Sequence, residues 1–173
     1  MSKAFTKDDD GDAELLVAPR APLPAGLPNY VTPRGLIALH AERASLEREH
    51  GVVGASDAPD RAVKLHALAQ RLAALQTRIA TAVLVDTPTR PHGEVRFGAR
   101  VRVRNSVGKE LVYRIVGIDE ADAESGRIAF SSPLARALLG KREGDSAPVD
   151  TPRAHEELEV LGIDYEADAG EAR

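Results

Sequence analysis

Leu65-His-Ala-Leu68-Ala-Gln-Arg-Leu72-Ala-Ala-Leu75-Gln-Thr-Arg-Ile79 carries a large apolar residue after alternate steps of three and four positions. Leu36, Leu39 and Leu46 fit the same repeat upstream. This alternation is the seam spacing of a coiled coil. The stretch 51–60 between the two arms contains the glycine and proline of a turn. The sequence therefore predicts an antiparallel coiled-coil hairpin over residues 30–86; two amphipathic helices buried in one globule are the alternative.

One register of this hairpin pairs leucines across the seam and also places opposite charges side by side on its flanks. It places Leu36 on Leu75, Leu39 on Leu72 and Leu46 on Leu65. The same register sets Glu49 beside Lys64 and Glu42 beside Arg71. Exposed ion pairs contribute only about 0.2–1 kcal/mol each, so we expect these pairs to select the register more than to stabilise it.

The ends of both helices carry recognisable signals. Thr32 is a good N-cap and Pro33 suits the first helical position. The first helix is predicted to run to about His50 and to stop at Gly51. The second is predicted to begin at Asp57 or Ala58, with Asp57 as its cap and Asp60 at its third position, in imitation of a capping box.

Beyond a predicted hinge at residues 87–91, the apolar pattern changes from helical spacing to alternation. A short helix, Leu134–Leu139, is expected after Ser132-Pro133 and before Gly140. Such a mixture indicates a small α+β domain over residues 92–166, followed by a tail at 167–173. The predicted strands are Ala99–Arg104, Leu111–Val116, Arg127–Ser131, a short one near Ala147–Val149, and Leu158–Tyr165.

Composition narrows the class of protein. The chain has 173 residues, a net charge of −4 and no cysteine, which excludes disulfides and thiolate metal sites. No apolar run approaches a membrane span and the N-terminus lacks the apolar core of a signal peptide, so the cytoplasm is the expected location. Residues 1–29, with an acidic run and four prolines, are predicted to be a disordered leader.

Two groups of charged residues are candidate functional sites. Asp57 and Asp60 at the hairpin turn could hold a hard cation such as Mg²⁺, although helix capping explains the same spacing. Lys64, Arg71 and Arg78 form a basic stripe at heptad spacing. This stripe could face a phosphate backbone or be merely solvated.

Several motifs together carry a family resemblance. They are Ser2-Lys-Ala-Phe-Thr-Lys7, Tyr30-Val-Thr-Pro-Arg-Gly35, Val95-Arg-Phe-Gly-Ala99, Tyr113-Arg-Ile-Val-Gly117-Ile-Asp-Glu120, Ser132-Pro-Leu-Ala-Arg-Ala-Leu-Leu-Gly140, Gly144-Asp145, Val149-Asp-Thr-Pro152 and Leu158-Glu-Val-Leu-Gly-Ile-Asp-Tyr165. In these motifs the sequence resembles the Gre family of bacterial transcription elongation factors, and its GreB members in particular, over nearly the whole chain.

The resemblance implies a C-terminal domain of FKBP-like fold that docks at the rim of the RNA polymerase secondary channel. The docking segment maps onto Ser131, Ser132 and Pro133, with Ser131 in place of the family's acid. The coiled coil is implied to enter the channel, near the 3′ end of the nascent RNA. Its tip acids are implied to support a Mg²⁺ ion of the polymerase, which itself cleaves backtracked RNA. The factor is thus an accessory protein with no cofactor of its own, and a monomer.

The hairpin departs from this family pattern. The tip motif Asp-x-x-Glu-Asn-Ala-x-Tyr is absent, and only Asp57-Ala-Pro-Asp60 echoes its acids. Each arm is about one heptad short, which retracts the tip by roughly 10 Å at 1.5 Å per residue. The leading hypothesis is a polymerase-binding factor with weak or no stimulation of cleavage; the alternative is an active GreB-type cleavage factor that uses Asp57 and Asp60. Prolyl isomerase activity is suggested only by the implied fold, which does not carry activity.

Overall fold

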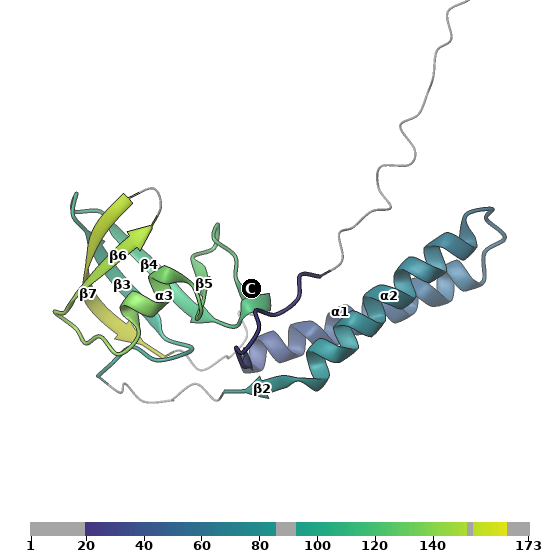
Figure 1. Cartoon of the computed structure of the whole chain (residues 1–173), viewed down its shortest axis with the longest axis horizontal. Coiled ribbons are helices and arrows are strands. Elements are labelled where there is room, and N and C mark those ends of the chain that lie inside the picture. Colours follow the sequence, from purple (N-terminus) through teal and green to yellow (C-terminus); the bar gives the residue numbers. More distant parts are fainter. Residues whose placement is uncertain (1–19, 86–92, 152–153, 166–173) are drawn as a thin grey trace, which may run out of the picture.

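The computed structural model describes residues 20–85, 93–151 and 154–165. A pair of helices extends as an arm from one side of a curled five-stranded sheet (Figure 1). The predicted α+β class is confirmed. The predicted hinge at 87–91, the tail at 167–173 and residues 1–19 of the predicted leader lie outside the described residues.

The first helix, α1 (Pro33–Gly54), begins as predicted. Thr32 is its N-cap, and the Thr32 hydroxyl accepts a hydrogen bond from the Gly35 amide at 3.0 Å. The predicted stop at Gly51 is wrong, because the helix continues for about one more turn. Glycine costs only about 1 kcal/mol inside a helix, and Val53 in the added turn packs against the leucine cluster between the helices.

The second helix, α2 (Arg61–Ala80), begins later than predicted. Asp60 is the residue at its N-cap position and makes no side-chain capping bond. The Asp60 carboxylate instead contacts Lys64 Nζ at 2.7 Å. The predicted capping box from Asp57 is therefore wrong, since Asp57 lies well ahead of the first turn.

A continuous apolar cluster joins the two helices. Leu39 and Leu46 of α1 are buried against Leu68 and Leu75 of α2, and Leu36, Leu72 and Ile79 pack around them. Leu65, which the predicted register sets against Leu46, is only half-buried. The two predicted charge pairs, Glu49 with Lys64 and Glu42 with Arg71, are also replaced. Lys64 contacts Asp60 instead, and Glu42 contacts Arg20.

A two-stranded parallel sheet closes the base of the hairpin and was not predicted. It pairs β1 (Asn29–Val31) with β2 (Ala82–Leu84). The Asn29 side chain is buried and donates to the Arg78 carbonyl at 2.8 Å, which satisfies a free acceptor at the end of α2. The predicted disordered leader therefore needs correction over residues 20–29, where Asn29 and Arg20 make defined contacts.

The C-terminal part is built on a sheet with strand order β5-β4-β3-β7-β6. All of its neighbours are antiparallel except β4 and β5, which are parallel. The strands are β3 (Arg100–Asn105), β4 (Glu110–Val116), β5 (Arg127–Ala129), β6 (Ser146–Thr151) and β7 (Ala154–Asp164). All five predicted strands are present, with shifts at their ends.

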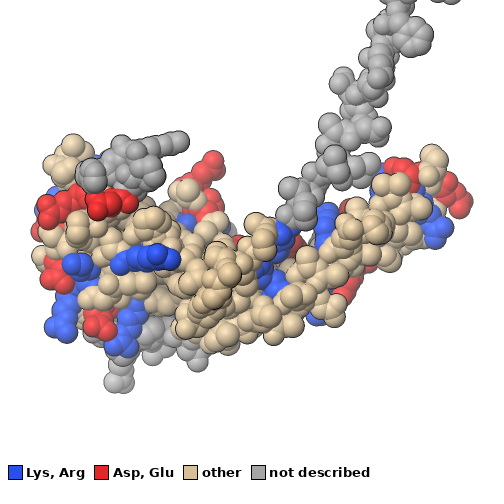
Figure 2. All heavy atoms as spheres, in the orientation of Figure 1, with Lys and Arg blue, Asp and Glu red and all other residues tan. Residues whose placement is uncertain are grey.

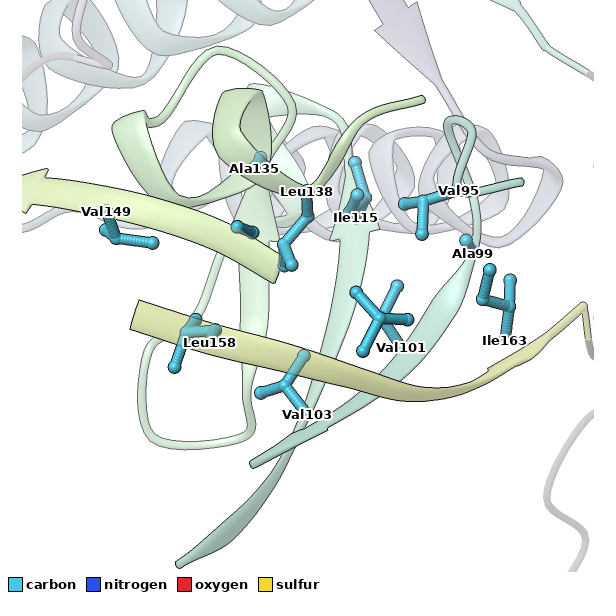
Figure 3. Close-up of a cluster of buried hydrophobic side chains, with 12 residues drawn as sticks. Val95, Ala99, Val101, Val103, Ile115, Ala135, Leu138, Val149, Leu158 and Ile163 are labelled. Atoms are coloured by element: carbon cyan, nitrogen blue, oxygen red, sulfur yellow. The ribbon is translucent and has the colours of Figure 1, made fainter. Parts of the chain in front are cut away.

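The short helix α3 (Pro133–Leu138) covers one face of this sheet. Figure 3 shows Ala135 and Leu138 of α3 above Val101 and Val103 of β3. The alternating apolar residues of β3 are fully buried, and its arginines Arg100, Arg102 and Arg104 lie on the exposed face. Among the described helices, none has the length and apolar character needed to cross a membrane.

Candidate functional site

The far end of the hairpin carries charges of both signs (Figure 2). Asp57 is exposed there, while Asp60 is paired with Lys64 one turn into α2. The hydrogen bond from Lys64 holds the pKa of the Asp60 carboxyl below its ordinary value. One of the two predicted tip acids is thus paired with a lysine of its own helix, in an exposed contact.

The tip carries the two acids, Asp57 and Asp60, that the sequence predicts as candidate metal ligands. In the described parts of the chain, no group of three or more histidine, aspartate or glutamate side chains is arranged to hold a metal ion. Mg²⁺ usually takes one or two protein carboxylates together with waters and substrate oxygens. Asp57 and Asp60 are therefore groups that could contribute to such a coordination shell.

The predicted basic stripe does not form one exposed surface. Lys64 pairs with Asp60 and Arg71 is half-buried. Arg78, with only 7% of its side chain exposed, points into the C-terminal part and lies 2.9 Å from Asp119. The inclusion of Arg78 in an RNA-facing stripe is therefore wrong, because the last turn of α2 packs on the loop after β4.

The predicted docking residues lie at the start of α3. The Ser132 hydroxyl caps this helix and accepts a hydrogen bond from the Ala135 amide at 3.1 Å. Pro133 is exposed and Ser131 is half-buried. Just before them, Phe130 packs with Tyr30 of β1 at a ring distance of 5.3 Å. The turn is therefore fixed both by its own cap and by an aromatic contact with the hairpin base.

The junction between hairpin and sheet is the most densely bonded polar region. It includes the 3-10 helix η2 (Ile118–Glu120). The Glu120 carboxylate accepts hydrogen bonds from the Thr32 amide (2.9 Å), the Thr32 hydroxyl (2.5 Å) and the Gly117 amide (3.2 Å). This places a negative charge at the N-terminus of α1, where the helix dipole stabilises it.

Asp119 joins the junction to two other segments. Arg20 Nη1 donates to Asp119 at 2.7 Å, and Arg20 also contacts Glu42 of α1. Arg78 approaches the second oxygen of Asp119 as an ion pair without hydrogen-bond geometry, which leaves that oxygen with no hydrogen bond. A cavity of about 240 Å³ opens beside these groups and is lined by acids and arginines together.

Two glycines allow this close approach. A Cβ atom on Gly35 would lie 2.1 Å from the Glu120 carboxyl carbon, and one on Gly117 would lie 2.3 Å from the Tyr30 carbonyl oxygen. A side chain at Gly117 would require the backbone to move, and one at Gly35 would displace the Glu120 carboxylate from its hydrogen bonds. The sequence motifs Tyr30–Gly35 and Gly117–Glu120, which carry part of the family resemblance, are thus two halves of one contact. Sequence reasoning missed it because Asp119 and Glu120 look like the start of a solvated acidic loop.

Comparison with known proteins decides the family. Residues 90–165 match the family described as "Transcription elongation factor, GreA/GreB, C-term". The chain is 36% identical to transcription elongation factor GreB of Neisseria meningitidis serogroup B over 153 residues, which cover 79% of this chain and 94% of that protein. The chain belongs to the GreA/GreB family. Its resemblance to the Gre family is therefore confirmed.

Some GreA proteins match over a shorter length. The chain is 41% identical to transcription elongation factor GreA of Methylococcus capsulatus over 97 residues, which are 55% of this chain and 61% of that protein. Among solved structures, GreA/GreB from Nitrosomonas europaea matches at 19% identity and a TM-score of 0.40, over 80% of this chain and 99% of that one. The GreA factor homolog 1 of Thermus thermophilus matches at 24% identity and a TM-score of 0.38. This match covers 80% of this chain and 99% of that one.

Proposed function

We propose that this chain binds bacterial RNA polymerase through its C-terminal part, enters the secondary channel with its hairpin and modulates elongation with weak or no stimulation of transcript cleavage. The observation that carries this proposal is a contrast within the chain. The C-terminal part matches its family over residues 90–165. The tip, in contrast, offers Asp57 together with an Asp60 that is paired with Lys64.

The chemistry of cleavage makes this contrast meaningful. A carboxylate supports Mg²⁺ only in direct contact, at about 2 Å. An Asp60 group held by Lys64 must give up that ion pair before it can reach a metal ion. We therefore expect this hairpin to occupy the channel more readily than it completes a metal site. The expected effects are modulation of elongation and competition with other Gre factors for the channel.

The finer structural assignments belong to the same proposal. The helical pair is proposed to act as a coiled-coil arm, and the sheet with α3 as an FKBP-like domain. Ser131, Ser132 and Pro133 are proposed as the contact with the channel rim, since their turn is exposed at Pro133 and held rigid by the Ser132 cap. The chain is proposed to act as a cytoplasmic monomer that carries no cofactor, with any RNA cleavage catalysed by the polymerase.

A pull-down with purified core RNA polymerase tests the binding proposal. We expect the chain to be retained, and retention to fall when Pro133 is replaced by Asp. The matched control is Pro148→Asp, at an exposed proline on the edge strand β6, on the face opposite the buried Ala147 and Val149 that pack in the core with α3. Absence of binding by the parent chain would remove the proposal.

The second candidate function is active cleavage stimulation by Asp57 and Asp60. It is favoured by the exposure of Asp57 at the end of the arm, where nothing in the described residues covers it. In this case stalled, backtracked complexes would yield shortened RNA. The double change Asp57→Ala and Asp60→Ala would abolish that product without affecting binding.

A further inference from the structure

The charges at the junction alternate in sign along a chain of contacts. Arg78 of α2 contacts Asp119, Asp119 contacts Arg20, and Arg20 contacts Glu42 of α1. We name these four residues the junction cluster. Two of its members, Arg78 and Asp119, are nearly inaccessible, with 7% and 9% of their side chains exposed. Charges buried to this extent are stable only when they are paired.

Arg20 reaches this cluster from outside both domains. It lies ahead of β1, in the segment 20–28 that runs past the base of the hairpin (Figure 1). The neighbouring Ala21 carbonyl accepts a hydrogen bond from Arg78 Nη2 at 2.5 Å. The segment therefore contacts α1, α2 and η2 at once, by two consecutive residues.

We infer that the segment 20–28 is a strap that fixes the direction of the hairpin relative to the C-terminal domain, with Arg20 as its positioning residue. Without Arg20, Asp119 keeps its ion pair with Arg78, while Glu42 loses its ion pair. Other contacts between the hairpin and the C-terminal domain, through Arg78, Glu120 and the Tyr30 ring, lie at the base of the hairpin. Glu42 lies nine residues beyond the start of α1, so the strap adds a restraint farther along the arm and opposes its tilt.

The length of the arm makes a small tilt important. Helix α1 has 22 residues and is about 33 Å long at 1.5 Å per residue. A tilt of about 10° at its base would displace the tip by about 6 Å. This role rests on the proposed function, since the position of the tip matters only to a protein that inserts it into a partner.

The test measures the direction of the arm in the free protein. The chain has no cysteine, so Ala55→Cys at the tip and Val107→Cys in the β3–β4 turn provide two unique spin-label positions. Pulsed electron double resonance then gives the distribution of distances between them. We expect one narrow distribution in the parent and a distribution at least twice as broad after Arg20→Ala. Arg48→Ala, an exposed arginine on α1, is the matched control and is expected to leave the distribution unchanged.

A second measurement separates positioning from folding. Arg20 lies outside both apolar clusters, so Arg20→Ala is expected to keep the helical circular dichroism of the parent. A broadened distribution with unchanged helicity supports the strap. An unchanged distribution after Arg20→Ala overturns it. Neither outcome depends on polymerase, so this inference fails separately from the proposed function, which the pull-down tests.

Discussion

Arg78 Nε lies 2.9 Å from a carboxylate oxygen of Asp119, and both side chains are almost fully buried. The pair joins the last turn of the hairpin to the loop after β4. A basic residue that the sequence places on a solvated helix face is thus part of the contact between the two halves of the molecule. The hairpin and the sheet are connected by specific charges as well as by the chain.

Loss of Arg78 should destabilise the protein strongly. Removing one partner of a buried ion pair costs about 3–5 kcal/mol, and we expect Arg78→Met to lie near the low end because Arg20 still contacts Asp119. Urea unfolding monitored by circular dichroism measures the change. Arg48→Met, an exposed arginine on α1, is the control and should change the free energy of unfolding by less than about 0.5 kcal/mol.

Two glycines of the same helix should respond in opposite directions to alanine. At Gly51 nothing lies within 4 Å of a new Cβ, so Gly51→Ala should stabilise the protein by about 0.5–1 kcal/mol. At Gly35 the Cβ would collide with Glu120, so Gly35→Ala should destabilise it by about 1–3 kcal/mol. Thermal unfolding of both variants tests this contrast, and a stabilising Gly35→Ala would contradict the junction as described.

The Thr32 cap should contribute more than an ordinary helix cap. Thr32→Ala removes both the bond from the Gly35 amide and the bond to Glu120, so we expect a loss of about 2 kcal/mol, the upper end for such caps. Thr77→Ala, at an exposed position in the last turn of α2, is the control, since its hydroxyl bonds only the Ala73 carbonyl. Equal effects of the two changes in urea unfolding would show that the contact with Glu120 contributes nothing.

The ion pair at the tip should be visible in a titration. The hydrogen bond from Lys64 lowers the pKa of Asp60, so this contact stabilises the folded state above the ordinary carboxyl pKa and the contribution is lost as the pH falls through the lowered value. Carboxyl-detected NMR should show the pKa of Asp60 rising in Lys64→Met. An unchanged Asp60 pKa in that variant would mean that Asp60 is free to bind a cation.

Local patterns account for most of the fold. The leucine spacing predicted both helices, the alternation in Ala99–Arg104 predicted the buried face of β3, and Ser132-Pro133 predicted α3. These features depend on residues close together in the sequence. The end of α1 was missed because Gly51 keeps a helical conformation when Val53 beyond it has a packing surface.

The junction could not be predicted in the same way. Thr32 and Glu120 are separated by 88 residues, and neither has an unusual neighbour in the sequence. From the sequence alone, Arg78 fits a solvated helix face as well as an interface between domains. Only the position of Asp119 in the structure decides between them. Of the candidate sites, the tip acids lie at the end of the arm as expected, while the basic stripe is divided between the tip and the junction.

We propose that this chain occupies the polymerase channel without efficiently completing its metal site. RNA cleavage in backtracked elongation complexes tests this proposal, with the chain alone and with the chain added in excess to a GreB factor. We expect little or no shortened RNA from the chain alone, together with inhibition of the cleavage that GreB stimulates. Efficient cleavage by the chain alone, abolished by Asp57→Ala with Asp60→Ala, would contradict it.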